Sequence, residues 1–325
     1  MIISKSPFRI SFFGGSTDYE EWFTNNGGAF ISLAFQKYSY SVVKRLPKNS
    51  NKKYNIQWRI KEATNNINNI KQPIVRESLR FYKFFENLDF IYFADLPASS
   101  GIGSSSAYCC AVGNCIMNLK NISFDKYKLA ENSYQIENKF LKENVGIQDQ
   151  IASSFGNLNY VKIRKNRTFK INPIILKDHE RFEFLGRLLL VYTDEQRNSS
   201  QMAQLILKNL EKKKEILIKI QRIVDEAYSS LINQDIDTFG KLLEHTWELK
   251  KELSKKMITK KTKDLFEILN KREILGYKIM GAGGGGFILA YFKEGKRDKF
   301  ISKYLKNKLY IKPEIDESGT RTIIY

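Results

Sequence analysis

A glycine- and serine-rich segment at residues 97–107 constrains this chain more than any other part of its sequence. It reads Pro-Ala-Ser-Ser-Gly-Ile-Gly-Ser-Ser-Ser-Ala, and a run with helical character follows. The first N–H groups of a helix have no partner within it and lie at the positive end of its dipole. Glycines there let a phosphate approach the backbone, and serines can cap the helix or bind a phosphate or its metal. The segment is a candidate phosphate-binding loop; a serine-capped helix after a glycine turn is the alternative.

This candidate loop differs from the common P-loop. No lysine stands in it, and no Gly-Lys-Ser/Thr follows. If the loop binds ATP, it does so by another geometry. The residues that we expect to bind the nucleotide phosphates are Ser99, Ser100, Gly101, Ile102, Gly103, Ser104, Ser105 and Ser106.

The length and patterning favour a two-domain α+β protein. At 325 residues the chain can bury a large core. Strands and helices are mixed without strict alternation, which favours an α+β fold. We expect domains at residues 1–180 and 181–325, although no glycine- or proline-rich linker marks the boundary. The patterns predict strands at Ile2–Ile3 and Phe8–Phe13, and helices over Phe124–Glu143, Ile147–Phe155 and most of residues 199–270.

The formal net charge of +19 raises the question of a nucleic-acid partner. The lysines are spread through the chain, and the two most basic segments, residues 208–222 and 250–263, alternate with apolar residues at helical spacing. That pattern favours solvated helix faces. We therefore expect no nucleic-acid partner, and the excess positive charge suits anionic small molecules.

Other functional classes are disfavoured by the sequence. No apolar run reaches the length of a membrane span, and the N-terminus lacks the apolar core of a signal peptide, so we expect a cytoplasmic protein without a membrane partner. Cys109, Cys110 and Cys115 lie in one apolar run and make poor disulfide partners, so we expect buried packing residues.

Two further segments accompany the candidate phosphate-binding loop at residues 97–107, which is called the phosphate loop below. Residues 7–19 read Pro-Phe-Arg-Ile-Ser-Phe-Phe-Gly-Gly-Ser-Thr-Asp-Tyr, and residues 278–287 read Lys-Ile-Met-Gly-Ala-Gly-Gly-Gly-Gly-Phe. Apolar residues flank the four consecutive glycines, whereas a flexible linker would have polar neighbours. The glycine run therefore predicts close approach of its backbone to another loop or to a ligand.

In this order the three segments resemble the signature motifs of the small-molecule kinase superfamily that includes galactokinase, homoserine kinase, mevalonate kinase and phosphomevalonate kinase. The resemblance is closest to the heptose 7-phosphate kinases and covers nearly the whole chain. It implies an N-terminal domain related to a ribosomal-protein fold, a ferredoxin-like C-terminal domain, and an active site between them. It also implies ATP and Mg²⁺ as cofactors in a monomer or homodimer.

The reaction implied is transfer of the γ-phosphoryl group of ATP to the anomeric hydroxyl of a heptose 7-phosphate, which feeds the synthesis of nucleotide-activated heptose for surface polysaccharide. Two alternatives stay open. One is a kinase of an unphosphorylated sugar such as galactose or fucose on the same fold. The other is a sugar or nucleotide sensor without catalytic activity.

Two charged residues are the candidate catalytic pair. Arg9 stands inside an apolar strand, where a cation is costly unless it is paired. We expect Arg9 to pair with Asp149, to favour its charged form and to stabilise charge on the transferred phosphoryl group; a structural ion pair is the alternative. The resemblance makes Asp149 the acceptor of the sugar hydroxyl proton.

The same resemblance assigns Mg²⁺ to Ser105 and Glu137, and carboxylate and hydroxyl oxygens suit that ion. It has Asp18 bind two sugar hydroxyls, although a helix-capping role for Asp18 is as plausible from the residues alone. The other candidate substrate-binding residues are Gly14, Gly15, Ser16, Thr17, Gly283, Gly284, Gly285 and Arg197. For Arg197 a surface role is equally open, and Lys250 is a weaker candidate for binding a remote phosphate.

The first motif departs from galactokinase. There the segment reads Gly-Glu-His-Thr-Asp-Tyr, whereas here it reads Gly-Gly-Ser-Thr-Asp-Tyr at residues 14–19. Loss of the Glu-His pair disfavours galactose as the substrate, and the Gly-Gly-x-Thr-Asp-Tyr form resembles the heptose phosphate branch.

Overall fold

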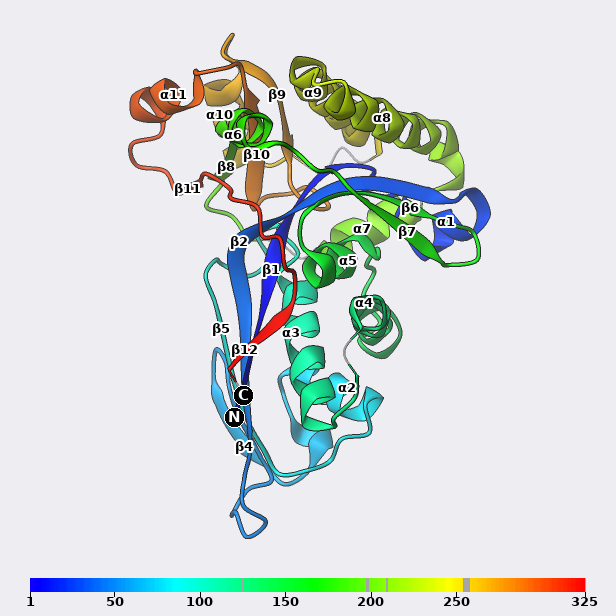
Figure 1. Ribbon diagram of the computed structural model, residues 1–325, viewed down its shortest axis with the longest axis vertical. Coiled ribbons are helices and arrows are strands. Elements are labelled where there is room, and N and C mark those ends of the chain that lie inside the picture. Colours follow the sequence, from blue (N-terminus) through cyan, green and yellow to red (C-terminus); the bar gives the residue numbers. More distant parts are fainter. Residues whose placement is uncertain (124, 197–198, 209, 254–257, 325) are drawn as a thin grey trace.

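The computed structural model describes residues 1–324, except residues 124, 197–198, 209 and 254–257. Within these residues the strands form two sheets, with helices packed beside each (Figure 1). The α+β fold predicted from the sequence is confirmed. The larger sheet has the order β12-β1-β2-β5-β3-β4, and β6 and β7 extend it from β2. Its strands are β1 (Ile2–Phe13), β2 (Gly28–Arg45), β3 (Tyr54–Gln57), β4 (Lys61–Thr64), β5 (Leu88–Ala94), β6 (Leu158–Ile163), β7 (Phe169–Pro173) and β12 (Arg321–Ile324).

Strand β1 is longer than the sequence predicted. The two short runs expected at Ile2–Ile3 and Phe8–Phe13 belong to one continuous strand. The polar residues between them look like a break in the sequence, but Ser4 and Ser6 are buried and hydrogen-bonded, Ser4 to Asn114 and Ser6 to Thr320. Small hydroxyl residues can occupy a buried strand when such partners satisfy them.

Helices cover one face of the larger sheet (Figure 1). Helix α3 packs on β1 and β2, and its cysteines Cys109, Cys110 and Cys115 are buried and free, as predicted. A π-helical turn at Ile136–Phe140 replaces the last part of the helix expected over residues 124–143. The helices on this face are α2 (Pro73–Phe81), α3 (Ser104–Leu119), α4 (Lys126–Gln135) and α5 (Gln148–Phe155).

The smaller sheet has the order β11-β8-β10-β9; helix α9 packs on β9, and helix α8 packs on α9 (Figure 1). Its strands are β8 (Leu188–Tyr192), β9 (Ile274–Ile279), β10 (Phe287–Phe292) and β11 (Tyr310–Ile311). The remaining helices are α1 (Glu20–Asn26), α6 (Asp178–Gly186), α7 (Ser199–Leu207), α8 (Lys214–Ile232), α9 (Ile236–Leu253), α10 (Lys260–Leu269) and α11 (Arg297–Tyr304), with 3₁₀ turns at Ile67–Asn69 and Glu211–Lys213.

One hydrophobic core joins the two sheets. Phe12 and Phe13, at the end of β1, pack edge-on against Phe239 of α9. Lys278 of β9 is buried, and its Nζ donates hydrogen bonds to the carbonyls of Ser11 and Phe12 at 2.8 and 2.7 Å. The end of β1 is therefore fixed against the smaller sheet, at the place where the first motif turns.

The last described strand returns to the start of the chain. β12 pairs antiparallel with β1, so residues 321–324 belong to the larger sheet although they follow the smaller one. The domain boundary expected at residue 180 stays a prediction. The pairing of β12 with β1 joins residues from the two sides of that boundary.

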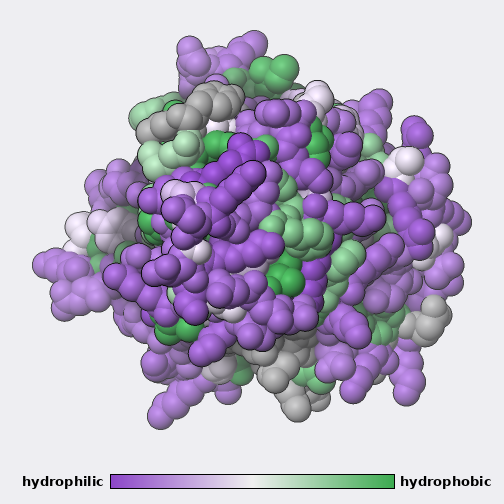
Figure 2. Space-filling model, turned by 90° about the horizontal axis from the view of Figure 1, so that it is seen from below, coloured by the Kyte–Doolittle hydropathy of each residue, from purple (hydrophilic) through white to green (hydrophobic). Residues whose placement is uncertain are grey.

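The basic residues of α8 face solvent, as the helical spacing predicted. Lys214, Lys219 and Arg222 are exposed, whereas Leu217 and Ile220 of the same helix are buried. Figure 2 shows one face of the molecule, on which hydrophilic side chains cover most of the surface. Among the described residues, none of the helices is long and apolar enough to cross a bilayer.

Candidate active site

One cleft brings the three motif segments together. Arg9, Ser16 and Asp18 line it from the first motif, and Gly281 and Ala282 line it from the third. From the phosphate loop the lining residues are Ser99, Gly101, Gly103, Ser104, Ser105 and Ser106. Segments far apart in the sequence therefore share one site.

The phosphate loop ends in an uncapped helix. Gly103 is the N-cap residue of α3, with a φ of 74° that favours glycine, and no side chain of the described residues caps this helix. The serine-capped alternative is therefore not what the structure has. The first N–H groups of α3 and the hydroxyls of its first turn lie at the cleft, where an anion would bind favourably.

The glycine run, residues 283–286, and the residue that follows it pack against the backbone of the phosphate loop. The N–H of Phe287 donates to the carbonyl of Ser100 at 2.9 Å, and a Cβ at Gly286 would lie 2.3 Å from the same oxygen. A Cβ at Gly101 would lie 2.8 Å from the carbonyl oxygen of Met280. The close approach of two backbones that the sequence predicted is confirmed, and it requires glycine on both sides.

Arg9 and Asp149 form a bidentate ion pair. Nε and Nη2 of Arg9 donate to the two carboxylate oxygens of Asp149 at 2.7 and 2.8 Å. Nη1 of Arg9 donates to the carbonyl of Gly101 at 2.6 Å. The Arg9 side chain is buried, whereas the Asp149 side chain is 25% exposed and lines the cleft. A carboxylate that is both paired and accessible can accept a proton from a bound ligand.

Glu137 is buried beside the serines of the loop. Its carboxylate accepts hydrogen bonds from Ser105 Oγ at 2.7 Å and from the amide of Gln150 at 2.6 Å. Burial raises the pKa of Glu137 to about 7, opposed by hydrogen bonds from Ser105, Ser106 and Gln150. The π-helical turn places this side chain toward the cleft.

The residues around Glu137 fit a hard divalent cation. A buried carboxylate with a raised pKa gains from a cation, and Ser105 and Glu137 offer the oxygen ligands that Mg²⁺ prefers. Clusters of three or more His, Cys, Asp or Glu side chains suited to a metal are absent from the described residues. Mg²⁺ does not need such a cluster, because it usually takes one or two carboxylates plus phosphate oxygens.

Asp18 is held by backbone N–H groups. It accepts hydrogen bonds from the N–H of Ser16 at 3.0 Å and from that of Gln148 at 3.4 Å. A Cβ at Gly146 would lie 1.9 Å from Asp18 Oδ2, so that neighbour must be glycine. Burial, and then the charge of Asp149, raises the pKa of Asp18 to about 6. Tyr19, not Asp18, occupies the N-cap position of α1, so the capping role is not observed.

Several predicted site residues lie behind the described lining of the cleft. Ser100 and Ile102 belong to the phosphate loop but are fully buried and do not line the cleft. Thr17 donates to the carbonyls of Gly14 and Ala29 and so holds the first motif in its turn. The others that do not reach the described lining are Gly14, Gly283, Gly284 and Gly285. Arg197 falls outside the described residues.

The cleft is also lined by residues that were not predicted from the sequence. These are Ser11, Tyr19, Glu143, Asn144, Val145, Gly146, Gln148, Ala203, Ile206, Gly281 and Ala282. Gly281 and Ala282 belong to the recognised third motif, and Gln148 adjoins Asp149. Ala203 and Ile206 come from α7, whose sequence carries only a helical apolar pattern.

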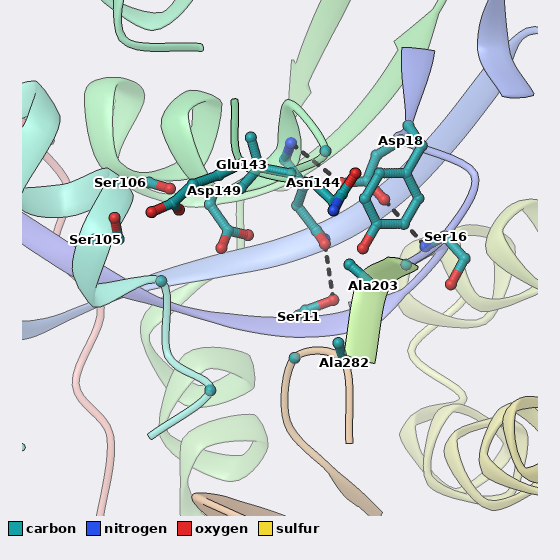
Figure 3. A pocket seen from close by; sticks show the side chains of 18 of the residues that line it. Ser11, Ser16, Asp18, Ser105, Ser106, Glu143, Asn144, Asp149, Ala203 and Ala282 are labelled. Carbon is teal, nitrogen blue, oxygen red and sulfur yellow. Dashed lines mark hydrogen bonds between the residues drawn. The ribbon is translucent and has the colours of Figure 1, made fainter. Parts of the chain in front are cut away.

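Figure 3 shows how these side chains are arranged. Ser105 and Ser106 lie at one end of the pocket, and Asp149 lies between them and the other end, nearer to the serines. Ser16 and Asp18 lie toward the other end. The pocket therefore has one end at the start of α3 and an opposite end with hydrogen-bonding groups, with the Arg9–Asp149 pair between them.

This arrangement is that of a phosphotransferase for small molecules, and the comparisons with known proteins agree. Residues 68–157 match the family model described as the GHMP kinases N terminal domain, and residues 227–311 match the GHMP kinases C terminal model. The chain belongs to the GHMP kinases, and it is an ATP-dependent kinase.

Individual relatives are distant but align over nearly the full length. A D-glycero-alpha-D-manno-heptose 7-phosphate kinase of Campylobacter jejuni is 23% identical, with 95% of each chain covered. A solved D-glycero-D-manno-heptose 1-phosphate kinase from Bacteroides thetaiotaomicron has a TM-score of 0.82 at 20% identity, with 100% of each chain covered. Lactococcus lactis galactokinase with galactose has a TM-score of 0.77 at 17% identity, covering 99% and 95%. Similarity at this level to solved structures shows the shared fold alone.

Proposed function

We propose that this kinase transfers the γ-phosphoryl group of ATP to the anomeric hydroxyl of D-glycero-D-manno-heptose 7-phosphate. The observation that carries the proposal is the position of the Arg9–Asp149 pair, between the uncapped start of α3 and the hydrogen-bonding groups around Asp18. The similarity to the Campylobacter jejuni enzyme over 95% of each chain supports a sugar phosphate as acceptor.

In the proposed complex the phosphates of ATP bind at the phosphate loop. The N–H groups at the start of α3 and the hydroxyls of Ser104 and Ser105 face the nucleotide phosphates. The glycine run below the loop fixes its backbone through the bond from Phe287 to Ser100. Positioning of this kind supplies much of the rate in phosphoryl transfer.

Ser105 and Glu137 would hold Mg²⁺ beside the phosphates. The ion supplies neutralisation of the negative charge on the phosphate oxygens. Gln150 keeps the Glu137 carboxylate oriented toward Ser105 through its own hydrogen bond. The raised pKa of Glu137 means that the metal-bound form is favoured as the pH rises above about 7.

The chemical step uses Asp149 and Arg9. The anomeric hydroxyl oxygen attacks the γ-phosphorus, a new P–O bond to the sugar forms, and the P–O bond to ADP breaks. Asp149 accepts the hydroxyl proton, because its carboxylate is accessible from the cleft. Arg9 holds that carboxylate in place and adds positive charge near the transferred group.

Asp18 would bind two hydroxyls of the sugar. Its carboxylate is fixed by the N–H groups of Ser16 and Gln148, which leaves the remaining acceptor positions for the ligand. A charged carboxylate accepts hydrogen bonds more strongly than its protonated form does. Sugar binding is therefore expected to weaken as the pH falls below about 6, the pKa of Asp18.

The test is ADP release with Mg²⁺-ATP against a panel of acceptors. The panel contains heptose 7-phosphate, mannose 6-phosphate, galactose, fucose and mevalonate. Turnover with the heptose phosphate, and little with the neutral sugars, is the expected result. Turnover confined to a neutral sugar would keep the kinase reaction and replace the acceptor. Retained ATP binding with no turnover on any acceptor would contradict the proposal and favour a sensor.

A further inference from the structure

Part of the larger sheet is uncovered on one face. Around β5, in the described part of the chain, helices α2 and α3 lie on one side of the sheet only (Figure 1). The second half of β2 alternates accordingly. Ser39 and Ser41 are buried on the helix side, whereas Tyr40 and Val42 point to the other side and are partly exposed. This other side is called the open face below.

Apolar and aromatic side chains meet on the open face. The pairing of the strands places Ile3 beside Val42, and Val42 beside Ile91. It also places Tyr40 beside Phe93, and the two rings stack with their centroids 4.6 Å apart. Phe93 is 48% exposed and Ile91 is 36% exposed. Because these residues are cross-strand neighbours, they form one continuous apolar surface rather than scattered exposed side chains.

Strand β12 extends this surface at the edge of the sheet. Asn114 and Asn118 of α3 donate hydrogen bonds to Thr322, so Thr322 points to the helix side and Ile323 points to the open face. Ile323 is 44% exposed. The open-face patch therefore draws on β1, β2, β5 and β12, and it consists of Ile3, Tyr40, Val42, Ile91, Phe93 and Ile323.

Cations beside the open-face patch have carboxylates close to them. At one end of the patch Lys44 pairs with Asp89 at 3.3 Å, and at the other end Arg321 pairs with Asp316 at 2.9 Å. Lys5, next to Arg321 across the strands, is attracted by the charges of Asp316 and Asp95. The two signs are thus balanced here, although the chain as a whole carries a formal net charge of +19.

This balance indicates what covers the patch. Nucleic acids and anionic membranes bind to surfaces with an excess of positive charge, which the open face does not offer. Two copies of a chain with a net charge of +19 repel each other, so they associate best where the local charges cancel and apolar surface is buried. Both ends of the patch carry both signs, so a two-fold axis through its centre opposes no pair of purely like-charged surfaces.

We propose that the open face is the interface of a homodimer, in which two copies of this chain pack their larger sheets against each other. Sheets that pack face to face lie about 10 Å apart and bury the side chains between them. Aromatic residues near the centre of an interface contribute most of its binding energy, so Tyr40 and Phe93 dominate this one. The inference is independent of the proposed function, because it uses none of the residues of the cleft.

The test is the mass of the protein in solution, measured by sedimentation velocity and by light scattering over a range of protein concentrations. The wild type is expected to be a dimer that dissociates on dilution. Phe93→Lys places a charge in the centre of the patch and should raise the dimer dissociation constant about 30-fold or more, the effect of losing a dominant interface residue. A wild type that is monomeric at every concentration, or a Phe93→Lys dimer as tight as the wild type, overturns the proposal.

Phe182→Lys is the matched control, since Phe182 is 82% exposed on α6, away from the open face (Figure 1). It should dimerise like the wild type, and equal weakening by Phe182→Lys and Phe93→Lys contradicts the proposal. Ile91→Lys adds the same charge elsewhere in the patch and should also weaken the dimer. Thermal unfolding of the monomeric fractions shows that the substitutions act on association rather than on the fold.

The effect of salt separates an apolar interface from one held by opposite charges. Salt screens the repulsion between the two positively charged copies, so the dissociation constant of the wild type should fall as the NaCl concentration rises from about 50 to 500 mM. A dissociation constant that rises over this range would show that ion pairs hold the dimer, and would overturn the assignment to the open-face patch.

Discussion

Both carboxylate oxygens of Asp149 accept hydrogen bonds from Arg9, at 2.7 Å from Nε and 2.8 Å from Nη2. The same guanidinium donates to the carbonyl of Gly101 in the phosphate loop. One side chain thus joins the proposed proton acceptor to the proposed phosphate-binding loop. Because the guanidinium is planar and its donors are fixed, this link sets a distance and an orientation together.

Replacing Asp149 should remove most of the turnover and leave nucleotide binding in place. Asp149→Asn keeps the size of the side chain but lowers its basicity, so kcat is expected to fall about 10²- to 10⁴-fold, the range for loss of a general base. The measurement is steady-state ADP release, with ATP affinity from calorimetry. Asp178→Asn, an exposed aspartate at the start of α6, is the control. Unchanged turnover in Asp149→Asn would rule out its role as the base.

The contact between the glycine run and the phosphate loop can be tested with a pair of glycines. Gly286→Ala would place a Cβ 2.3 Å from the Ser100 carbonyl, so the loop must move. We expect KM for ATP to rise about tenfold or more, since small displacements in a catalytic site are costly. Gly295→Ala also has a positive φ, of 64°, but its Cβ would meet nothing within 4 Å. That control should cost only about 1 kcal/mol of stability. Equal ATP kinetics in both variants would contradict the contact's role.

The raised pKa of Asp18 predicts that the stability of the folded protein depends on pH. Its pKa is 3.8 ordinarily and about 6 in the folded protein, so the folded state binds this proton more tightly than the unfolded chain does. The contribution of Asp18 to stability therefore decreases as the pH rises from about 4 to 7, by roughly 3 kcal/mol at most. In Asp18→Asn the fall in Tm over this range should be shallower than in the wild type, without ligands. Parallel pH profiles of the two proteins would show that Asp18 does not titrate in this way.

The proposed role of Glu137 as a Mg²⁺ ligand predicts that turnover depends on the Mg²⁺ concentration. Glu137→Gln keeps a side-chain oxygen but removes the charge. The Mg²⁺ concentration for half-maximal turnover should therefore rise about 100-fold or more, which is a larger effect than the loss of a residue that contacts only a metal ligand. The measurement is ADP release during a Mg²⁺ titration at saturating ATP. Glu131→Gln, at an exposed position of α4, should titrate like the wild type. Chelation by EDTA should abolish turnover in the wild type, and added Mg²⁺ should restore it.

The parts of the site that could be predicted are those where the type of a residue, in its local sequence, already requires a particular kind of contact. A cation within the apolar strand around Arg9 requires a partner, and an aspartate supplies it. Four glycines between apolar segments indicate backbone contact, and Gly286 packs on Ser100. The α+β fold could be predicted for the same reason, because its strands and helices are visible in the periodicity of the sequence.

The parts that could not be predicted depend on tertiary structure. Lys278 looks like one polar residue in an alternating strand, and only the packing of β9 on the end of β1 gives it two carbonyl partners. A regular helical period predicted a continuous helix where Glu137 lies in a π-helical turn. Ser100 and Ser105 are the same residue type in one loop, and the turn of the backbone decides which of them faces the cleft.

The pairing of β12 with β1 has a consequence for the order of folding during synthesis. Residues 2–13 leave the ribosome long before their edge partner, residues 321–324. Until then Ile3 and Lys5 present unpaired backbone groups along an open sheet edge, which can bind another chain. Contacts across so much of the chain also slow folding. The nascent protein should therefore depend on chaperones until β12 is released.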